Sequence, residues 1–589
     1  MKASRAGEGL PLAWTLAACL AVAWPPLIAY NVPPSATFFN QAAAFAGWGA
    51  FLLCLASRLS PRTWPRSAGL RSLLASLAVL MGAAAAAPWW TGLPPSLALS
   101  SVGVIAAAAF VSIIAAGVCE AGLSRPAFDA FCIGLVVAGL ASAAVGLLQV
   151  YAPRFPDGDW IARTPVVGRA VGNMRQPNHL SSLLLWSIVA VVWLRERGRV
   201  PDRLAWIAAA VLMDVIVLSG SRTGAVGCFV LASWGALDRR LSRPARIALI
   251  VAPVAYAVLW VAALEISHVT HVVFGGETRF STHGDVSSSR FAIWSNTLQL
   301  IAMHPLAGVG FGEFNFAWTL TPFPDRPVQF FDHTHDIVLQ FIVELGIPLG
   351  LLTLALLLFA LRVAVRRAVA DRGDGAPVTR AALVMVLMVL VHSLLEYPLW
   401  YSYFLFPAAF AFGLCLAGPP RDAAASQANQ GLDGKTTTTR PWVLAAMVMP
   451  LIAAVSLWDY SRVVVIFAPP ADAGPLEDRI EAGRHSWFFA PHADYAAATT
   501  AAHPATTMNS FKVATHYLLD TRLMMAWARA LEEAGDDERA RYVAQRLREF
   551  RNEGSDSFFA PCVDANAPAA ERPFQCKAPT RTFTYEDFR

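Results

Sequence analysis

The chain repeats one kind of segment many times, a run of about 20 apolar residues, which is the length a helix needs to cross a bilayer. Such runs lie near 11–30, 38–57, 70–87, 96–119, 128–150, 179–194, 204–219, 223–238, 245–264, 336–361, 380–396, 400–418 and 441–460. The composition agrees, since 56% of the 589 residues are hydrophobic and 15% are charged, whereas soluble domains carry about 25% charge. We therefore predict an all-α polytopic membrane protein with about 13 transmembrane helices.

The basic residues predict the orientation of these helices. The N-terminal segment and the loops after even-numbered runs hold 23 Arg and Lys residues, and the loops after odd-numbered runs hold eight. Because basic residues favour the cytoplasmic side, we expect a cytoplasmic N-terminus. An odd number of spans then places the C-terminal tail outside. The first run follows M-K-A-S-R-A-G-E-G-L-P without a small-residue cleavage site, so we expect it to be retained.

The charge distribution divides the chain into two predicted domains, a transmembrane domain at 1–460 with a large outward loop at 265–335, and a helical domain at 461–589. Around Gly535 the tail reads as two helices joined by a turn, of the tetratricopeptide kind. Cys562 and Cys576 lie in this tail, where the outside location permits a disulfide that closes a loop between them.

The eight basic residues of the outward loops, the tail excluded, are all arginines and fall in three loops. They are Arg154, Arg163, Arg169, Arg175, Arg222, Arg279, Arg290 and Arg326. Arginine presents a planar fork that binds phosphate oxygens through two donors, so this set favours an anionic ligand at the outer face. The alternative is that the arginines pair with Asp157, Asp159, Glu277 and Asp285 within folded loops. That alternative fits Arg222 least, because its short turn S-G-S-R-T-G holds no acidic residue.

The long loop 265–335 mixes polar and aromatic residues, and loops of this length are usually functional or disordered. Its aromatic content and an amphipathic piece near 290–304 argue against disorder. We expect a short helix along the outer interface, with Arg290 directed into the site.

His333 and His335 stand where this loop meets the apolar run at 336–361, in the stretch H-T-H-D-I-V-L-Q. Histidine is the simplest general base near neutral pH, and a Ser or Thr hydroxyl needs a base to become a nucleophile. Zinc binding and helix capping are the alternatives. No third ligand stands at a recognised spacing, so we expect no metal.

Two further stretches bring polar groups to the same outer face. In G-N-M-R-Q-P-N-H, Gln176 and Asn178 carry amides to the start of the run at 179–194. In H-S-L-L-E-Y-P-L-W-Y-S-Y, His392 and Glu396 are four residues apart, and Tyr397 and Tyr401 follow. These tyrosines are candidates for substrate contact or members of an interfacial aromatic belt.

The chain resembles the O-antigen ligase superfamily, and within it the protein O-oligosaccharyltransferase (PglL-type) branch of Gram-negative bacteria. The superfamily-like stretches are S-S-R-F-A-I-W-S, H-P-L-A-G-V-G-F-G and H-T-H-D-I-V-L-Q-F-I-V-E-L-G-I-P-L-G. The branch-like stretches are N-M-R-Q-P-N-H-L-S-S-L-L-L-W, L-S-G-S-R-T-G and L-L-E-Y-P-L-W-Y-S-Y-F-L-F-P, together with the C-terminal domain. The chain departs from the family at Asp336, where Asn is more frequent after the histidine.

The resemblance implies a metal-independent glycosyltransferase without a cofactor, in the bacterial inner membrane, with its site and tail in the periplasm. It would transfer a glycan from an undecaprenyl-pyrophosphate carrier to Ser or Thr hydroxyls of periplasmic or pilin proteins. Membrane lipids are further expected partners, and nucleic acid is not. By this carry-over His335 is the general base, and Arg222 and Arg290 hold the pyrophosphate. The other substrate-binding candidates are Gln176, Asn178, His333, Tyr397 and Tyr401.

Three other functions remain open at this point. A ligase for lipopolysaccharide core and a glycan polymerase would use the same donor chemistry. A transporter of lipid-linked sugar belongs to another class, although the chain shows no convincing internal duplication of the kind transporters carry.

Overall fold

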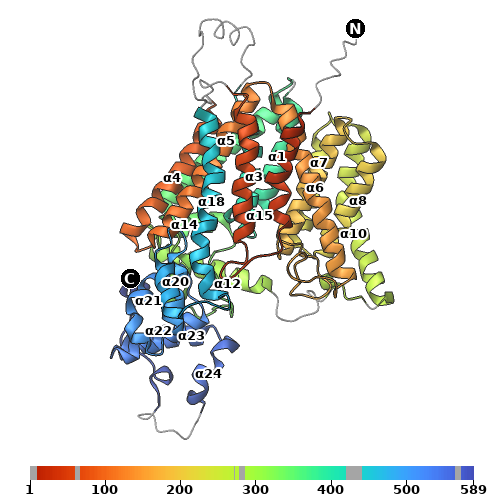
Figure 1. Ribbon diagram of the computed structural model, residues 1–589. Coiled ribbons are helices and arrows are strands. Elements are labelled where there is room, and N and C mark those ends of the chain that lie inside the picture. The colour runs from red at the N-terminus through yellow and green to blue at the C-terminus, as the bar shows by residue number, and fades with distance from the viewer. Residues whose placement is uncertain are drawn as a thin grey trace, which may run out of the picture.

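The computed structural model describes residues 10–59, 67–270, 272–277, 286–373, 375–418, 441–563 and 572–589. Within these residues the regular secondary structure is helical, with no strand. The all-α expectation is therefore confirmed for the described part of the chain. Figure 1 shows a bundle of long helices, with the C-terminal helices α20–α24 gathered beyond one end of it.

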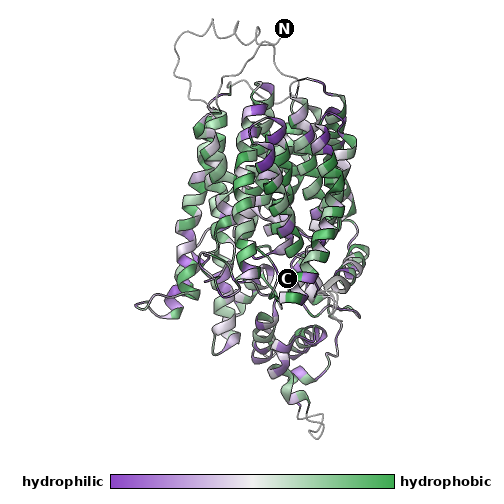
Figure 2. Ribbon diagram, turned by 90° about the vertical axis from the view of Figure 1, so that its right-hand side faces the viewer, coloured by the Kyte–Doolittle hydropathy of each residue, from purple (hydrophilic) through white to green (hydrophobic). Residues whose placement is uncertain are grey.

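Each of the thirteen apolar runs corresponds to a helix. These are α1 (Leu12–Val22), α3 (Phe38–Ala56), α4 (Ala68–Trp90), α5 (Pro95–Glu120), α6 (Ser124–Tyr151), α7 (Pro177–Glu196), α8 (Asp202–Leu218), α9 (Arg222–Leu237), α10 (Arg243–Thr270), α14 (Ile337–Ala370), α15 (Ala376–Ser393), α16 (Ser402–Leu416) and α18 (Pro441–Phe467). Among the described residues, nine helices are long and apolar enough to cross a membrane, and α1 and α16 are apolar but shorter. The count of 13 spans therefore stays a prediction. Figure 2 shows the apolar residues concentrated in the bundle.

Small residues allow these helices to approach closely, as is usual in membranes. A Cβ atom added at Gly47 in α3 would lie 2.2 Å from the carbonyl oxygen of Leu20 in α1. The same addition at Gly413 in α16 would lie 2.5 Å from the carbonyl oxygen of Ser112 in α5. Glycine at these two positions therefore sets the distance between the helix pairs.

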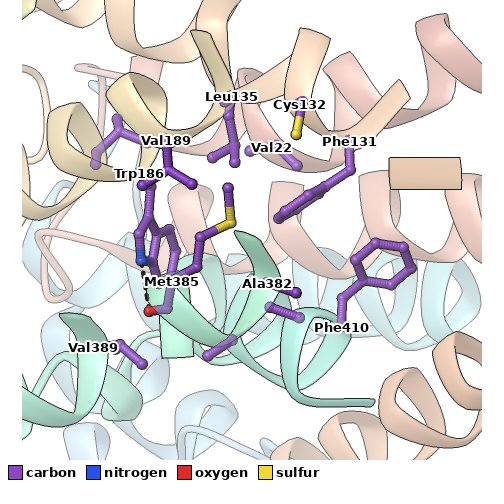
Figure 3. Packing of buried hydrophobic residues seen from close by; sticks show 14 of the residues in the cluster. Val22, Phe131, Cys132, Leu135, Trp186, Val189, Ala382, Met385, Val389 and Phe410 are labelled. Carbon is purple, nitrogen blue, oxygen red and sulfur yellow. Dashed lines mark hydrogen bonds between the residues drawn. The ribbon is translucent and has the colours of Figure 1, made fainter. Parts of the chain in front are cut away.

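Helix α7 lies at the centre of the bundle. In an apolar stretch of 18 residues in α7, 94% of the stretch is buried. Trp186 donates a hydrogen bond of 2.9 Å to the carbonyl oxygen of Met385 in α15 (Figure 3). Phe131, Leu135 and Val389 contribute to the same apolar cluster. The fixed position of α7 determines where its first residues emerge beside the site described below.

The described part of the loop 265–335 includes the helices α12 (Val286–Met303) and α13 (Phe314–Leu320). The helix expected near 290–304 is therefore present as α12. After α12 the chain runs against a break in α14, where Val309 N–H donates to Val343 O at 2.8 Å and Ile347 N–H donates to Pro305 O at 2.8 Å. The break is at Gly346, whose φ of 74° lies in the left-handed region.

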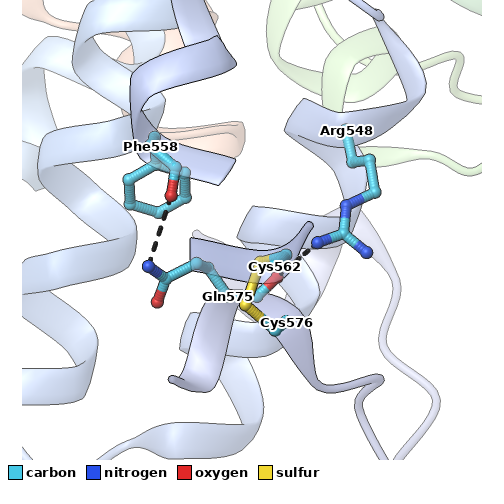
Figure 4. The surroundings of a disulfide bond; sticks show 5 residues. All are labelled: Arg548, Phe558, Cys562, Gln575 and Cys576. Carbon is cyan, nitrogen blue, oxygen red and sulfur yellow. Dashed lines mark hydrogen bonds between the residues drawn. A yellow bond between two sulfur atoms is a disulfide. The ribbon is translucent and has the colours of Figure 1, made fainter. Parts of the chain in front are cut away.

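The tail consists of α19 (Leu476–Arg484), α20 (Ala490–Thr500), α21 (Met508–Tyr517), α22 (Thr521–Glu533), α23 (Asp537–Glu549) and α24 (Asp556–Phe559). The expected turn between two helices is present at Gly535, with φ of 81°. The likeness to a tetratricopeptide unit stays a prediction. Cys562 and Cys576 form the expected disulfide, beside the hydrogen bond between Gln575 and Phe558 (Figure 4).

The tail and the region around α13 share one apolar core, which contains Phe314, Trp318, Phe511 and Leu547. Polar contacts cross the same boundary. The buried carboxylate of Glu313 lies 2.8 Å from Nδ1 of His516 in α21. The position of the tail is therefore tied to the segment that precedes the His333–His335 loop.

Candidate active site

His335 lies two residues before the start of α14, in a backbone conformation that few residues adopt. Its φ is 59°, a left-handed value that costs about 1–2 kcal/mol for a residue with a Cβ atom. Asp336 caps the helix, accepting hydrogen bonds from Val338 N–H at 2.8 Å and Leu339 N–H at 3.0 Å. The Oε1 atom of Gln340 accepts from Thr334 N–H at 2.8 Å. These bonds hold His335 in place, and strained residues held this way cluster at functional sites.

The hydrogen bonds of His335 define its tautomer. Nδ1 lies 3.1 Å from the carbonyl oxygen of His333, and because a carbonyl only accepts, Nδ1 carries the proton. The lone pair of the neutral ring is then on Nε2, which lies 3.7 Å from Oε2 of Glu396. The side chain is 12% exposed, so the ring is held in a mostly dry environment.

Several side chains of the site converge on the carboxylate of Glu396. Its Oε1 atom accepts a hydrogen bond of 2.9 Å from Nδ2 of Asn178 at the start of α7. The same oxygen pairs with the guanidinium of Arg290 from α12. One carboxylate, 9% exposed, therefore joins α7, α12 and the loop before α14.

Aromatic rings form one wall of the site. His333 stacks on Tyr397, with ring centroids 4.5 Å apart and an interplanar angle of 17°. His335 meets the same tyrosine edge-on, at 4.9 Å and 90°. Tyr401 lies 6.1 Å from Tyr397, its ring nearly parallel. Both histidines and both tyrosines expected from the sequence are thus brought together.

Burial and neighbouring charges together shift the pKa values of His335 and Asp332. It lowers the pKa of His335, which Glu396 raises in part and Arg290 lowers further. Burial would raise the pKa of Asp332, but the neighbouring His333 lowers it to about 2. His335 is therefore a neutral imidazole at pH 7.

Gln176 and Asn178 have different local roles. Gln176 caps α7, because its Oε1 atom accepts from Asn178 N–H at 2.5 Å and His179 N–H at 3.4 Å. The Asn178 side chain instead bridges two groups, donating to Glu396 and accepting from Ser221 Oγ at 2.6 Å. Ser221 caps α9, so this chain of bonds leads to Arg222, the half-buried first residue of that helix.

Several of the other outward arginines bind backbone carbonyls. Arg169 donates to Ser219 O at 2.7 Å and Arg163 to Pro156 O at 3.3 Å. Arg175 donates to Ala29 O and to Ala36 O. The expectation of an anionic ligand is wrong for Arg326, which is 2% exposed and pairs with Glu549 of the tail at 3.3 Å. Arg154 is exposed, and Arg279 and Asp285 lie outside the described residues.

His392 and Glu396 do not pair with each other, although their spacing suggested it. His392 Nδ1 is hydrogen-bonded to Ser182 Oγ at 2.8 Å. Helix α15 ends at Ser393, and the chain then turns Glu396 toward Asn178 and Arg290. The sequence therefore drew attention to Glu396 but missed its central position. Within the described ranges, no group of three or more His, Cys, Asp or Glu side chains is arranged to hold a metal ion.

Three protein families match parts of this chain. Residues 206–354 match the family described as O-Antigen ligase, and residues 170–194 match Protein glycosylation ligase. Residues 380–557 match Virulence factor membrane-bound polymerase, C-terminal. The matched ranges include Glu396 and the three residues around it, which are Asn178, Arg290 and His335. We call these four residues the Glu396 centre.

Two relatives from Acinetobacter baylyi (strain ATCC 33305 / BD413 / ADP1) are similar to this chain. The General O-oligosaccharyltransferase is 24% identical over 324 residues, which cover 51% of this chain and 55% of the relative. The ComP-specific O-oligosaccharyltransferase is 25% identical over 249 residues, 42% of this chain and 44% of the relative. The chain thus spans about half the length of each relative.

The stretches that match include Gln176 and Asn178 at the start of α7, Arg290 and His335 around the long loop, and Glu396 after α15. In these stretches the chain is similar to the O-Antigen ligase and Protein glycosylation ligase families and to the two O-oligosaccharyltransferases.

Proposed function

We propose that this protein transfers a preassembled glycan from undecaprenyl pyrophosphate to Ser or Thr hydroxyls of periplasmic or pilin proteins. The observation that carries the proposal is the orientation of the His335 imidazole. Its Nδ1 proton is engaged by His333 O, and its Nε2 lone pair faces a buried site that contains Arg290. Such a group accepts a proton from a hydroxyl, and the names of the two relatives supply the acceptor class.

In the proposed reaction the acceptor oxygen attacks the anomeric carbon of the glycan. A new carbon–oxygen bond forms there as the bond from the anomeric carbon to the pyrophosphate oxygen breaks. The hydroxyl proton passes to Nε2 of His335, and undecaprenyl pyrophosphate leaves with the bonding electrons. A single displacement of this kind inverts the anomeric centre. No nucleotide sugar or metal is required.

Arg290 and Arg222 are proposed to bind the leaving pyrophosphate. Arg290 uses one guanidinium nitrogen on Glu396, and a guanidinium has five N–H donors, so the same side chain can bind Glu396 and a phosphate oxygen. Cationic donors fixed in advance stabilise the charge that develops on the leaving group. Glu396 is proposed to position Arg290 and His335, since it pairs with Arg290 and lies beside His335.

The remaining candidates are proposed to shape the substrate site. Tyr397 and Tyr401 offer aromatic faces on which a sugar ring can rest, and His333 supports Tyr397 by stacking. Asn178 orients Glu396. Gln176 keeps an amide nitrogen in addition to its capping oxygen, and that nitrogen is proposed to contact the glycan.

The location follows from the distribution of basic residues. We infer a bacterial inner-membrane protein with a cytoplasmic N-terminus and a periplasmic site and tail. The 23 basic residues at the N-terminus and in the even-numbered loops, against eight in the odd-numbered loops, support this orientation.

A ligase that moves O-antigen onto lipopolysaccharide core is the second candidate, favoured by the O-Antigen ligase match at 206–354. Both functions use the same donor and the same base. Glycopeptide mass spectrometry of periplasmic proteins, with and without this protein, separates them. Glycopeptides that disappear with the protein support the proposal. Loss of lipopolysaccharide O-antigen with unchanged glycoproteins supports the ligase, and donor accumulating on the cytoplasmic leaflet supports a flippase.

A further inference from the structure

A cavity of about 690 Å³ lies at the end of the bundle remote from His335. It forms where several helix ends converge: the start of α1, the end of α3, the α5–α6 turn, the end of α7, the end of α14 and the start of α15. In Figure 1 this is the end of the bundle at which α1 begins, opposite the C-terminal helices.

Helix α14 gives the scale of the separation, because it begins beside His335 and contributes Arg367 and the following Asp371 to the cavity. Its 34 residues, at 1.5 Å per residue, would span about 50 Å as an unbroken helix, and the break at Gly346 shortens that span. This is close to the full thickness of a bilayer with its headgroups, about 40–45 Å. The cavity is therefore at the opposite membrane interface and is not part of the Glu396 centre.

The lining of the cavity is strongly basic. The charged residues that line it are Arg58, Arg125, Arg197, Arg199, Arg367, Asp129 and Asp371. These described residues carry a formal excess of three positive charges. Five arginines that meet at one concave surface repel one another, and an anion relieves that repulsion.

Local contacts hold two of these arginines toward the cavity. Asp129 is 1% exposed and receives a hydrogen bond of 2.8 Å from Trp193 Nε1. The same carboxylate pairs with Arg199 at 3.3 Å and with Arg197 at 3.6 Å. One carboxylate cannot neutralise two guanidinium groups, and each group keeps further N–H donors for a ligand.

Arg367 is oriented in a different way. Its guanidinium donates to the carbonyl oxygens of Cys415 and Ala417 at the end of α16. A backbone carbonyl carries no net charge, so this arginine keeps its full positive charge at the cavity wall. Arg58 is exposed at the end of α3, and Arg125 is half-buried after the α5–α6 turn.

We propose that this cavity is a binding site for a phosphate group. Arginine forks match phosphate oxygens with two parallel donors. The apolar part of the wall, which includes Leu10, Pro11 and Trp14, suits the ester substituent of an organic phosphate. The phosphate can come from an anionic phospholipid headgroup in the adjoining leaflet or from a soluble phosphate compound. The site is independent of the transfer reaction proposed above.

Membrane proteins also carry arginines on one side simply to set their orientation. Arg366 is the matched control for that role, since it is exposed on the same helix as Arg367 and does not line the cavity. Orientation alone would make Arg58, Arg125 and Arg366 equivalent in any binding assay. A phosphate site makes the first two different from the third.

The test uses the full-length protein and its R58Q, R125Q and R366Q variants. In one arm, delipidated protein in detergent is titrated with inorganic phosphate against chloride at equal ionic strength, and thermal unfolding is followed. In the other arm, native mass spectrometry counts phospholipids retained after release from nanodiscs of phosphatidylglycerol or phosphatidylcholine. Circular dichroism and gel filtration of each variant establish that it is folded.

If the ligand is a soluble phosphate compound, inorganic phosphate should stabilise the protein against thermal unfolding. The apparent affinity for phosphate should then be about tenfold lower in R58Q and R125Q and unchanged in R366Q. A lipid source predicts retained phosphatidylglycerol, lost in the same two variants and kept in R366Q, without an effect of inorganic phosphate. Absence of both effects in the unmodified protein overturns the proposal. Equal losses in all three folded variants overturn it as well.

Discussion

At the scale of single residues, the site depends on how one imidazole is held. His335 adopts a φ of 59°, and hydrogen bonds made by its neighbours stabilise this strained conformation. Asp336 caps α14, and Trp294 Nε1 donates to Thr334 O at 3.0 Å. Because Nδ1 is bound to His333 O, only Nε2 is available as a proton acceptor. The loop thus presents one defined nitrogen to the site.

The pKa of His335 leads to a prediction about the pH dependence of transfer. Burial lowers this pKa below its usual value of 6.5, and only the neutral ring can accept a proton. Transfer should therefore be lost as the pH falls through a value below 6.5. Glu396 raises the pKa of His335, so E396Q should move this acidic limb to still lower pH. The pH–rate profile of kcat/KM measures the shift.

The control for this experiment is D336N. Asparagine keeps the capping oxygen that Asp336 supplies to Val338 and Leu339, so the acidic limb should stay in place. The same variant shows whether Asp336, the departure from the family, matters for transfer. An acidic limb that does not move in an active E396Q protein would contradict the role of His335.

The sequence identified most of these residues but did not show how they meet. His335, Arg290 and Asn178 lie in separate stretches, and each was expected at the outer face. The four-residue spacing of His392 and Glu396 suggests neighbours on one helix, yet α15 ends at Ser393. Pro398 is only a partial signal, because it disfavours helix at Tyr397 and does not place the end of α15 before Glu396. The convergence of three elements on one carboxylate is a tertiary feature that local pattern does not encode.

At the scale of elements, the break in α14 fixes the direction of its first turns. The chain from Pro305 to Gly310 runs against the break and supplies backbone hydrogen bonds that the interrupted helix lacks. The glycines of this segment permit backbone to contact backbone. A Cβ atom at Gly308 would lie 2.5 Å from the amide nitrogen of Gly346. The H-P-L-A-G-V-G stretch is thus a support for the His335 loop.

Substitution at the break should disturb this support. In G346A the new Cβ would lie 2.2 Å from Leu306 O, at a φ of 74° that alanine rarely adopts. We expect the protein to lose about 3 kcal/mol of stability, together with most of its transfer activity. Thermal unfolding in detergent and the transfer rate measure the two effects.

G82A is the matched control, because a Cβ atom at Gly82 in α4 would meet nothing within 4 Å. It should leave both quantities unchanged or raise the stability slightly, since alanine favours helix. Equal behaviour of G346A and G82A would show that the break does not support the site.

The positions of the helices were predictable, and some of their ends were not. Each of the thirteen apolar runs located a helix, and nine of the described helices are long and apolar enough to cross a membrane. Helix α10 continues to Thr270 and α18 to Phe467, past the apolar runs that end at 264 and 460. In α18 the continuation packs against the tail, because Val463 and Ile466 share an apolar cluster with Ile480 and Ala493. Local hydropathy does not reveal such a partner.

At the scale of the whole molecule, the tail is attached to the segment that carries the site. Glu313, fully buried, pairs with His516, and Tyr542 OH donates to Leu320 O at 2.7 Å. Arg326, which follows α13, also contacts the tail by pairing with Glu549 of α23. The sequence placed Arg326 among the ligand candidates because nothing local to it reveals a partner more than 200 residues away.

Removal of one partner of the buried pair should weaken the attachment. H516A leaves the carboxylate of Glu313 buried without its imidazole, which should cost roughly 3–5 kcal/mol. Limited proteolysis should then release the tail sooner, and the unfolding midpoint should fall.

H503A is the control for this pair. His503 is 2.9 Å from Glu533, but its side chain is 77% exposed, and exposed pairs contribute little. We expect proteolysis and unfolding like those of the unmodified protein. A tail that is equally protected in H516A would mean that the apolar core alone attaches it.

In the proposed reaction, Nε2 of His335 accepts the proton of the acceptor hydroxyl during glycan transfer. The direct measurement is the transfer rate of purified H335A with undecaprenyl-pyrophosphate glycan and an acceptor protein, compared with unmodified protein and D336N. We predict a loss of about 10²–10⁴-fold in H335A, with donor binding and unfolding temperature retained and with D336N active. Transfer by H335A within a few-fold of the unmodified rate would contradict the account.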